Sequence, residues 1–263
     1  MQNEAEDRLR LEQDLKLGIR TGQFRLLYQP LINAADQRLM GFEALIRWHH
    51  PTRGVVPPNQ FITLAEESGL IMELGDWVID EACRAASAWP EHITVAVNIS
   101  AKQLIFPALP NTVNEAIRKH RLQANRLELE VTESVFMGDS ANALDVLKRL
   151  RALGVGIALD DFGTGYSSLG YLNKAVFHKL KIDGSFVRES AENRETVAII
   201  QSIVQLAKSF RMTVTAECVE TADEFTRMRD LGCHQIQGYL FGRPMEFERA
   251  SELVHGIQQR LSA

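Results

Sequence analysis

Short apolar, β-branched runs alternate regularly with stretches of helical spacing, and this pattern limits the fold more than any other feature of the chain. From residue 93 onward, strands are predicted near residues 93–98, 127–132, 155–160, 178–182, 213–217 and 234–237. Helices are predicted near residues 111–121, 140–152, 167–173, 194–210, 221–231 and 246–260. Strands that alternate with helices in this way are typical of βα units around a parallel sheet.

The N-terminal part adds two strands of a different kind. The runs from Arg25 to Ile32 and from Leu39 to Ile46 are separated only by Asn33 to Arg38. So short a connection predicts an antiparallel hairpin, because a parallel crossover needs a dozen residues or more. Two helices follow the hairpin. One begins at Pro58, and the other spans residues 71–88.

The hairpin brings the number of predicted strands to eight, the number that closes a filled barrel, and 263 residues is a usual length for one. We therefore expect an α/β fold, a modified (β/α)8 TIM barrel with an antiparallel first strand. Residues 1–22 are predicted to form a lead-in helix, and residues 23–263 a single domain.

Composition excludes some classes of function. A net charge of −5 gives no basic surface for long nucleic acid. No apolar run approaches the roughly 18 residues of a membrane span, so no membrane contact is expected. Cys83, Cys218 and Cys233 form no CxxC pair, and we predict buried free thiols in a reducing cytosol.

Polar side chains stand at or near the C-terminal ends of almost all the predicted strands. They are Glu43, Asn98, Glu130, Asp160, Asp161, Lys181, Glu217 and Gln237. In a closed α/β barrel these strand ends meet at one mouth, where barrel enzymes place their chemistry. Two carboxylates about 4 Å apart repel by on the order of 4 kcal/mol at an effective dielectric near 20. The pattern therefore predicts a metal site.

Each of these residues also has a simpler interpretation. A single Glu at a strand end is more often a helix cap or an ion-pair partner. Asp160 and Asp161 could cap a helix near Ser167, but neighbouring strand residues point to opposite sides, so only one of them could do so. Gly163 and Gly165 favour a flexible loop over a phosphate-binding one, because a lone GxG is weak evidence. His49 and His50 are predicted to lie at the surface.

The motifs resemble a known family. EALIRW is joined in order by YQP, RWHHP, VNIS, LELEVTES, DDFGTGYSSL, KIDGSFV, AECVE and QGYLFGRP. This set, from Phe24 to Pro244, is similar to the EAL domain, the bacterial phosphodiesterase module for cyclic di-GMP. The resemblance implies a (β/α)8 barrel with an antiparallel first strand and hydrolysis of cyclic di-GMP to linear pGpG.

The resemblance also implies residue roles. One divalent cation would be held by the residues Glu43, Asn98, Glu130 and Asp160. Asp160 would bridge to a second ion held with Asp161 and Glu217, while Lys181 and Glu217 contact the attacking water. Carboxylates and one amide suit Mg²⁺ or Mn²⁺, and Ca²⁺ is expected to inhibit because it prefers more ligands at longer distances.

Substrate contacts follow from the same resemblance. Gln29 and Gln237 would contact a guanine, Arg47 a phosphate, and Leu45 and Pro244 would form apolar walls. An arginine suits the phosphate because its planar fork of donors meets two oxygens at once.

Two further carboxylates, Glu133 and Glu220, lie three residues beyond Glu130 and Glu217. They are interpreted as loop anchors, with solvated faces as the alternative.

The chain departs from the family pattern in two places. Cys218 stands where the family commonly has Gly, and the stretch before Lys179 has Val176 and His178 in place of Pro and Asp. The second departure puts the geometry of the loop and of a dimer helix in doubt. Neither change removes a ligand.

Assembly and regulation are further expectations. The stretch FGTGYSSLGYLNKAVF, with Leu169, Leu172 and Val176, is predicted to form a homodimer interface, with simple coverage of the barrel as the alternative. We expect an upstream sensory or GGDEF domain in the parent protein. The location is expected to be the cytoplasm, or the inner face of the membrane if the parent has transmembrane segments. A receptor that binds cyclic di-GMP without cleaving it is the alternative function.

Overall fold

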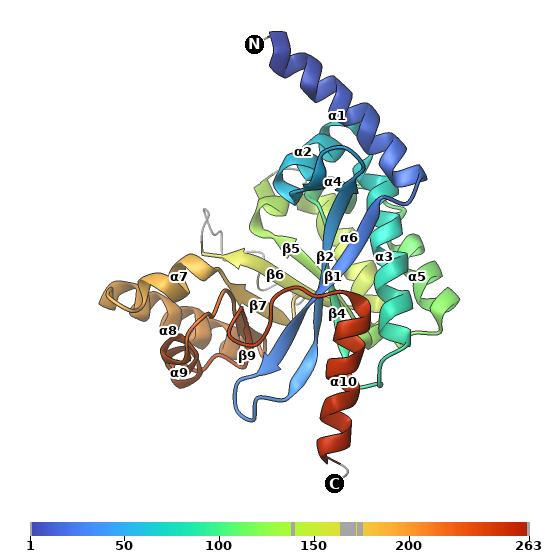
Figure 1. Ribbon diagram of the computed structural model, residues 1–263. Helices are drawn as coiled ribbons and strands as arrows, with labels where there is room; N and C mark the ends of the chain where they lie inside the picture. The colour runs from blue at the N-terminus through green and yellow to red at the C-terminus, as the bar shows by residue number, and fades with distance from the viewer. Residues whose placement is uncertain (1, 138–139, 164–171, 173–175, 262–263) are drawn as a thin grey trace.

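The computed structural model describes residues 2–137, 140–163, 172 and 176–261. Its centre is a closed barrel (Figure 1). The strands are β1 (Phe24–Asn33), β2 (Leu39–His50), β3 (Gly54–Val56), β4 (Thr94–Asn98), β5 (Leu127–Thr132), β6 (Gly156–Phe162), β7 (Lys179–Ile182), β8 (Thr213–Ala216) and β9 (Gln235–Gln237). They follow the order β1-β9-β8-β7-β6-β5-β4-β2-β3, and a β1–β2 pairing closes the ring. The predicted eight-stranded barrel is confirmed, with β3 as an extra strand on β2.

The first two strands form the predicted hairpin. β1 runs antiparallel to both β2 and β9, while β2 is parallel to β4. In the β1–β2 register Gln29 lies opposite Glu43. The antiparallel first strand is therefore confirmed, and the hairpin brings two of the predicted site residues side by side.

Helices surround the barrel. They are α1 (Gln2–Arg20), α2 (Pro58–Ser68), α3 (Ile71–Ser87), α4 (Ala101–Leu104), α5 (Leu109–His120), α6 (Ser140–Ala152), α7 (Gly184–Glu189), α8 (Arg194–Ser209), α9 (Ala222–Asp230) and α10 (Phe247–Leu261), with short 3₁₀ turns η1 (Ala124–Arg126) and η2 (Glu133–Met137). The short helices α4 and α7 were not predicted. The helix predicted near 167–173 lies outside the described residues except for Leu172.

Local sequence signals set several helix ends. Pro58 occupies the first turn of α2, where its missing N–H costs nothing, and Gly69 ends that helix with a left-handed φ of 78°. Thr221 and Glu224 form a reciprocal capping box at the start of α9. The Asn193 side chain accepts from the first backbone N–H groups of α8.

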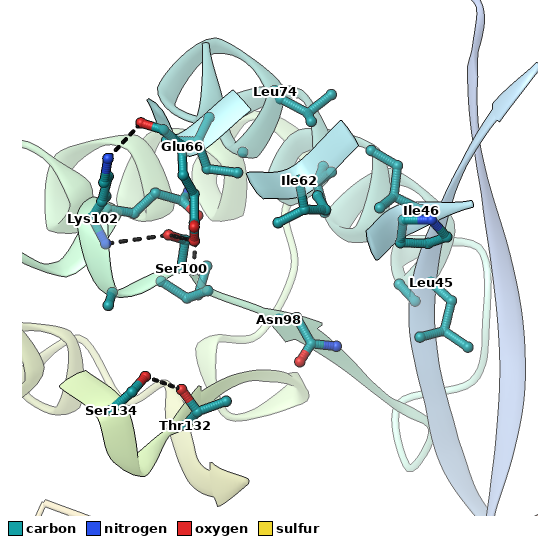
Figure 2. Close-up of a pocket in the computed structure, with 18 of the residues that line it drawn as sticks. Leu45, Ile46, Ile62, Glu66, Leu74, Asn98, Ser100, Lys102, Thr132 and Ser134 are labelled. Atoms are coloured by element: carbon teal, nitrogen blue, oxygen red, sulfur yellow. Dashed lines mark hydrogen bonds between the residues drawn. The ribbon is translucent and has the colours of Figure 1, made fainter. Parts of the chain in front are cut away.

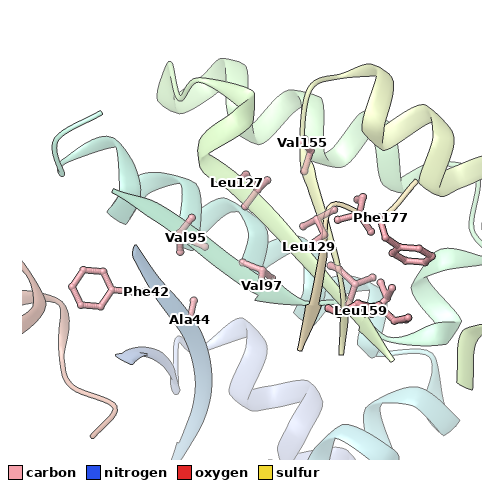
Figure 3. Close-up of a cluster of buried hydrophobic side chains, with 14 of the residues drawn as sticks. Phe42, Ala44, Val95, Val97, Leu127, Leu129, Val155, Leu159 and Phe177 are labelled. Carbon is pink, nitrogen blue, oxygen red and sulfur yellow. The ribbon is translucent and has the colours of Figure 1, made fainter. Parts of the chain in front are cut away.

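Along the barrel strands, apolar residues that face outward alternate with polar or charged residues that face the barrel interior. On β4 and β5 the odd-numbered residues, among them Val95, Leu127 and Leu129, belong to the main apolar core (Figure 3). Successive strand residues point to opposite faces, so Glu128 and Glu130 share the inner face of β5. The same rule places Lys179 and Lys181 on the inner face of β7.

A second, smaller core joins the lead-in helix to the barrel. Leu15 of α1 is buried with Phe24, Trp48 and Phe61. His50 lies beside this core with 8% of its surface exposed, and its Nε2 is 3.2 Å from Asp14 Oδ2. The prediction that His50 lies at the surface is therefore wrong, because the last residue of β2 packs against α1. His49 is exposed, as predicted.

Among the described helices, none is long and apolar enough to cross a membrane.

Candidate active site

Lys181 lies at the centre of the barrel mouth, with 2% of its surface exposed. Its Nζ is 2.6 Å from Glu217 Oε1 and 2.7 Å from Glu130 Oε2. The same atom is 3.3 Å from Asp160 Oδ2 and 3.7 Å from Glu43 Oε2. Side chains from five different strands or strand ends therefore converge on one point, as the sequence predicted.

Amide groups surround the Glu43 carboxylate. Asn98 Nδ2 donates to Glu43 Oε1 at 2.6 Å, and Gln237 Nε2 donates to Glu43 Oε2 at 2.6 Å. Gln237 Nε2 also reaches Gln29 Oε1 at 3.3 Å, and Gln29 Nε2 donates to the Gly242 carbonyl oxygen at 3.4 Å. These contacts fix Glu43 as an acceptor on both oxygens.

One ammonium faces four carboxylates in this cluster, so the negative charges are not balanced. Burial, together with the charges of Glu43 and Asp160, raises the pKa of Glu130 well above its ordinary value despite Lys181. Burial and the same neighbours raise the pKa of Glu217 to about 8. Burial alone would lower the pKa of Lys181, but the surrounding carboxylates raise it well above its ordinary value.

Asp160 and Asp161 lie on the same side of the sheet edge. The β6–β7 register shifts between Leu159 and Phe162, and Asp161 has a left-handed φ of 53°. Ligand oxygens of Asp160, Asp161 and Glu217 all lie within 4.8 Å of one another. The prediction that the two Asp residues point to opposite sides is therefore wrong, because a β-bulge with one left-handed residue turns Asp161 back toward the mouth.

This donor set fits a hard divalent cation. Asp160, Asp161 and Glu217 offer only carboxylate oxygens, the ligands that Mg²⁺ prefers, whereas zinc favours His and Cys. Burial and the charges of Asp160 and Asp183 raise the pKa of Asp161, and burial and the charge of Asp160 also raise the pKa of Glu217, so Asp160 repels both of the other acids. Glu43 and Glu130 come within 3.7 Å of the same Lys181 Nζ as Asp160, and Asn98 touches Glu43.

Two cavities open at this mouth. The smaller, about 200 Å³, is lined by Gln29, Glu43, Leu45, Asp160, Glu217, Cys218, Glu220, Gln237, Gly238 and Tyr239. The larger, about 520 Å³, lies beneath α2 and α3 and includes Leu45, Arg47 and Asn98 (Figure 2). Leu45 lines both, so the two cavities are neighbours. Pro244 is absent from both sets of lining residues in the described part of the chain.

The comparisons with known proteins identify the family. Residues 12–244 match the EAL domain model. This chain belongs to the EAL domain family. Two curated relatives from Pseudomonas aeruginosa are the bifunctional diguanylate cyclase/cyclic di-GMP phosphodiesterase MucR, 43% identical, and the cyclic di-GMP phosphodiesterase NbdA, 40% identical. The matches cover 95% and 97% of this chain but 37% and 33% of the relatives, so the chain spans about a third of their length.

A solved structure supports the fold as well. The PaMucR phosphodiesterase in complex with cyclic di-GMP is 42% identical, with a TM-score of 0.87. The match covers 92% of this EAL domain and 99% of the PaMucR chain.

Cys218 occupies a position of this EAL domain whose backbone conformation favours glycine. Cys218 has a φ of 54°, a left-handed conformation that glycine adopts without strain. Its side chain lies against Gly184, where an added Cβ would come within 2.4 Å of the Cys218 Cβ. Cys218 is exposed, so the prediction of a buried thiol is wrong for this residue and right for Cys83 and Cys233.

Two other sequence departures lie away from the mouth. His178 Nε2 is 2.8 Å from Glu128 Oε2, at the opposite end of the barrel interior. Val176 and Leu172 are 2% and 1% exposed and pack into the main core of this chain. These two side chains are therefore covered by their own barrel and are not available to a partner. Leu169 lies outside the described residues, and the dimer itself stays a prediction.

The two candidate loop anchors differ. Glu133 is buried, and its Oε1 accepts from the Gly163 backbone N–H at 2.9 Å, which ties η2 to the segment after Asp161. Glu220 is exposed, and its side chain lines the smaller cavity. The contact made by Glu133 supports a loop-anchoring role. For Glu220 the only observation of this kind is that it lines the smaller cavity.

Among the cavity residues that sequence reasoning missed, Tyr239 and Glu66 carry polar groups at the two cavities. Tyr239 lines the smaller cavity with its ring 4.0 Å from the Arg243 guanidinium carbon. Its place two residues after Gln237 in QGYLFG was the available signal. Glu66 lines the larger cavity from α2. No strand-end rule could find it, because it sits within a helix.

Proposed function

We propose that this EAL domain hydrolyses cyclic di-GMP to linear pGpG with the aid of two divalent cations, Mg²⁺ or Mn²⁺. The observation that carries the proposal is the convergence of Asp160, Asp161 and Glu217 oxygens within 4.8 Å beside the buried Lys181 ammonium. The named activities of MucR and NbdA support the same reaction class.

The cations are assigned to the acidic mouth. Asp160, Asp161 and Glu217 would hold one, and Glu43, Asn98, Glu130 and Asp160 the other. When bound, such ions acidify water and stabilise the attacking and leaving oxygens of an in-line displacement.

The remaining chemistry belongs to the side chains. Glu217, whose Oε1 lies 2.6 Å from Lys181 Nζ, serves as general base and takes the proton of the attacking water. Lys181, held 2.6 Å from Glu217, places a positive charge where the transferring phosphoryl group gains negative charge. Glu43 orients the cluster through its bonds to Asn98 and Gln237.

The substrate extends from the smaller cavity to the larger one. Gln29 and Gln237 face one guanine, and Leu45 separates the two cavities as an apolar wall. Arg47 lines the larger cavity, with its Nη1 now donating to the Ile46 carbonyl oxygen at 2.8 Å, and reaches a phosphate when substrate is bound. Pro244 forms a further apolar contact with the bound nucleotide, outside the residues that line the two cavities.

The alternative is a receptor that binds cyclic di-GMP and signals by conformation. Intact Glu43, Asp160 and Asp161 favour catalysis, because a receptor needs no cluster of mutually repelling acids. Chromatography of purified protein incubated with cyclic di-GMP and Mg²⁺ separates the two. Catalysis predicts that cyclic di-GMP is consumed and pGpG appears, whereas tight binding without pGpG would establish the receptor.

Assembly and context are part of the proposal. We place the domain in a homodimer, downstream of a sensory or GGDEF domain, in the cytoplasm or at the inner face of the membrane. Light scattering and activity across a dilution series test the dimer.

A further inference from the structure

The end of β2 that carries Arg47 is held by only part of the barrel. β2 pairs with β4 from Gly41 to Ala44, and in the described part of the chain no pair beyond Ala44 joins these two strands. Residues 45–50, here called the β2 arm, continue past that point and pair with β1 and β3. Leu45 and Arg47 of the β2 arm line the larger cavity. The position of Arg47 therefore depends on the segments that pack against the β2 arm.

One of these segments is the lead-in helix α1. Successive strand residues point to opposite faces, so Trp48 and His50 face away from the side that carries Arg47. Trp48 is fully buried in the smaller core together with Leu15 of α1. Gly18 allows this close approach, because an added Cβ there would lie 2.8 Å from Trp48 Nε1. The β2 arm thus has α1 on one face and Arg47 on the other.

His50 adds a polar connection between the β2 arm and α1. Its Nδ1 accepts from the backbone N–H groups of Thr52 at 3.2 Å and of Arg53 at 3.1 Å. Since Nδ1 acts as an acceptor, Nε2 carries the ring proton, and it lies 3.2 Å from Asp14 Oδ2. The His50 side chain therefore joins the turn that follows the β2 arm to α1.

The smaller core also supports the other wall of the larger cavity. Phe61 and Leu64 of α2 and Leu74 of α3 are buried in it with Leu15. Leu74 lines the cavity as well, and so does Ile62 of α2 (Figure 2). α1 lies against α2 (Figure 1). A change in the packing of α1 would therefore reach both walls of the cavity.

We propose that α1 positions the Arg47 side chain for the substrate phosphate, through the contacts that Leu15 and Asp14 make with the β2 arm. The inference rests on the proposed function, since it uses the phosphate contact assigned to Arg47. Leu15 and Asp14 are positioning residues, because neither lines the cavities. The metal cluster is outside their influence, because Glu43 lies in the part of β2 that pairs with β4. A domain that moves α1 would thus change the affinity for substrate and not the chemical step.

The first test compares Leu15→Ala with the parent chain. The matched control is Leu17→Ala, which makes the same change on the outer side of α1, where Leu17 is 55% exposed. For all three proteins, kcat and KM for cyclic di-GMP are measured in Mg²⁺, Kd for cyclic di-GMP is measured in Ca²⁺, and the melting temperature is recorded.

In Leu15→Ala the KM should rise by roughly five- to 150-fold, the usual range for coupling between two sites, while kcat at saturation stays near the parent value. Leu17→Ala should match the parent in both. In Asp14→Ala the KM should rise by about two- to tenfold, the worth of one hydrogen bond. Asp14→Asn should restore the parent KM, because its amide oxygen still accepts from His50 Nε2–H.

A double-mutant cycle with Arg47→Ala tests the route. When the Arg47 side chain is absent, α1 has nothing to position, so adding Leu15→Ala should leave KM at the value of Arg47→Ala alone. Rises in KM that simply add would overturn the route through Arg47.

A folded Leu15→Ala protein with the parent KM would overturn the positioning role and leave the hydrolase assignment intact. The same holds for a fall in kcat and melting temperature without a change in KM, which is the result of a purely structural role. Should Leu15→Ala fail to fold, equal KM values for Asp14→Ala and Asp14→Asn would overturn the proposal in its place. A parent chain without turnover would remove the proposed hydrolysis, and the Kd values in Ca²⁺ would then decide the coupling by themselves.

Discussion

Strands β5 and β7 carry a buried ion cluster at each end, and the two clusters differ in charge balance. At one end Glu128 lies 2.7 Å from Lys179 Nζ and 2.8 Å from His178 Nε2. Burial alone would raise the pKa of Glu128, but Lys179 and His178 lower it to about 2. At the other end, two residues further along each strand, Glu130 and Lys181 share their space with three more carboxylates.

The comparison separates structural charge from functional charge. Both clusters use the inner face of the same two strands, so burial and geometry are nearly matched. The first is satisfied within the chain, whereas the second has more negative than positive charge. An excess of buried negative charge that persists in a folded protein points to a positive partner from outside the chain.

The largest effect on activity is expected for Glu217→Gln at the unbalanced end. The substitution keeps size and hydrogen bonding but removes the base, so kcat should fall by about a hundredfold or more. The melting temperature in excess chelator near pH 7 should change little, because Glu217, with a pKa of about 8, is mostly neutral there and Gln is its neutral isostere. Steady-state kinetics and thermal unfolding check both. Turnover at the parent rate would show that Glu217 is not the base.

The opposite response is expected for Glu128→Gln at the balanced end. Lys179 would remain charged and buried without its carboxylate, at a cost of about 3–5 kcal/mol in the free energy of unfolding. The kcat of the folded protein should change little. Denaturant unfolding and kinetics below the melting temperature test this. The comparison fails if this variant loses turnover but keeps its stability.

Divalent ions should stabilise the protein through the carboxylates of the barrel mouth and not through Glu128. At a free Mg²⁺ concentration about 100 times Kd, the free energy of unfolding should rise by about 2.7 kcal/mol. Ca²⁺ should bind but inhibit turnover. Thermal unfolding across an Mg²⁺ titration measures the gain, which Glu217→Gln should reduce and Glu128→Gln should keep. Equal loss in both variants would place the ions elsewhere.

A smaller effect is expected in the pH dependence of the free energy of unfolding, measured in excess chelator. The folded pKa of Glu128, about 2, lies below its ordinary value of 4.5, so its stabilisation is present above pH 4.5 and lost as pH falls toward 2. The folded pKa of Glu217, about 8, lies above 4.5, so its contribution is full below pH 4.5 and lost as pH rises through 8.

The two variants should show these opposite trends. The stability gap between parent and Glu128→Gln should shrink as pH falls from 4.5 toward 2. Relative to Glu217→Gln, the parent should lose stability as pH rises from about 5 to 8. Melting temperatures across both pH ranges measure the trends, and the same sign in both variants would refute the distinction between the clusters.

Periodicity and strand-end chemistry were enough to predict the barrel, the antiparallel hairpin and the convergence of polar side chains at one barrel mouth. Features that depend on single backbone angles were not predictable. Asp161 turns to the mouth through a left-handed residue in a bulge, and alternation alone gave it the wrong side. His50 and Glu66 were missed because what they face is decided by α1, α2 and the segment after β4, which meet only in the folded chain.

The central claim is that the excess negative charge at the mouth exists to hold catalytic cations. Its most direct test is the release of linear pGpG from cyclic di-GMP by the purified chain, measured by chromatography in Mg²⁺ and again in excess chelator. The account predicts steady release in Mg²⁺, none in chelator, and recovery when Mg²⁺ is restored. Full activity in excess chelator would contradict it.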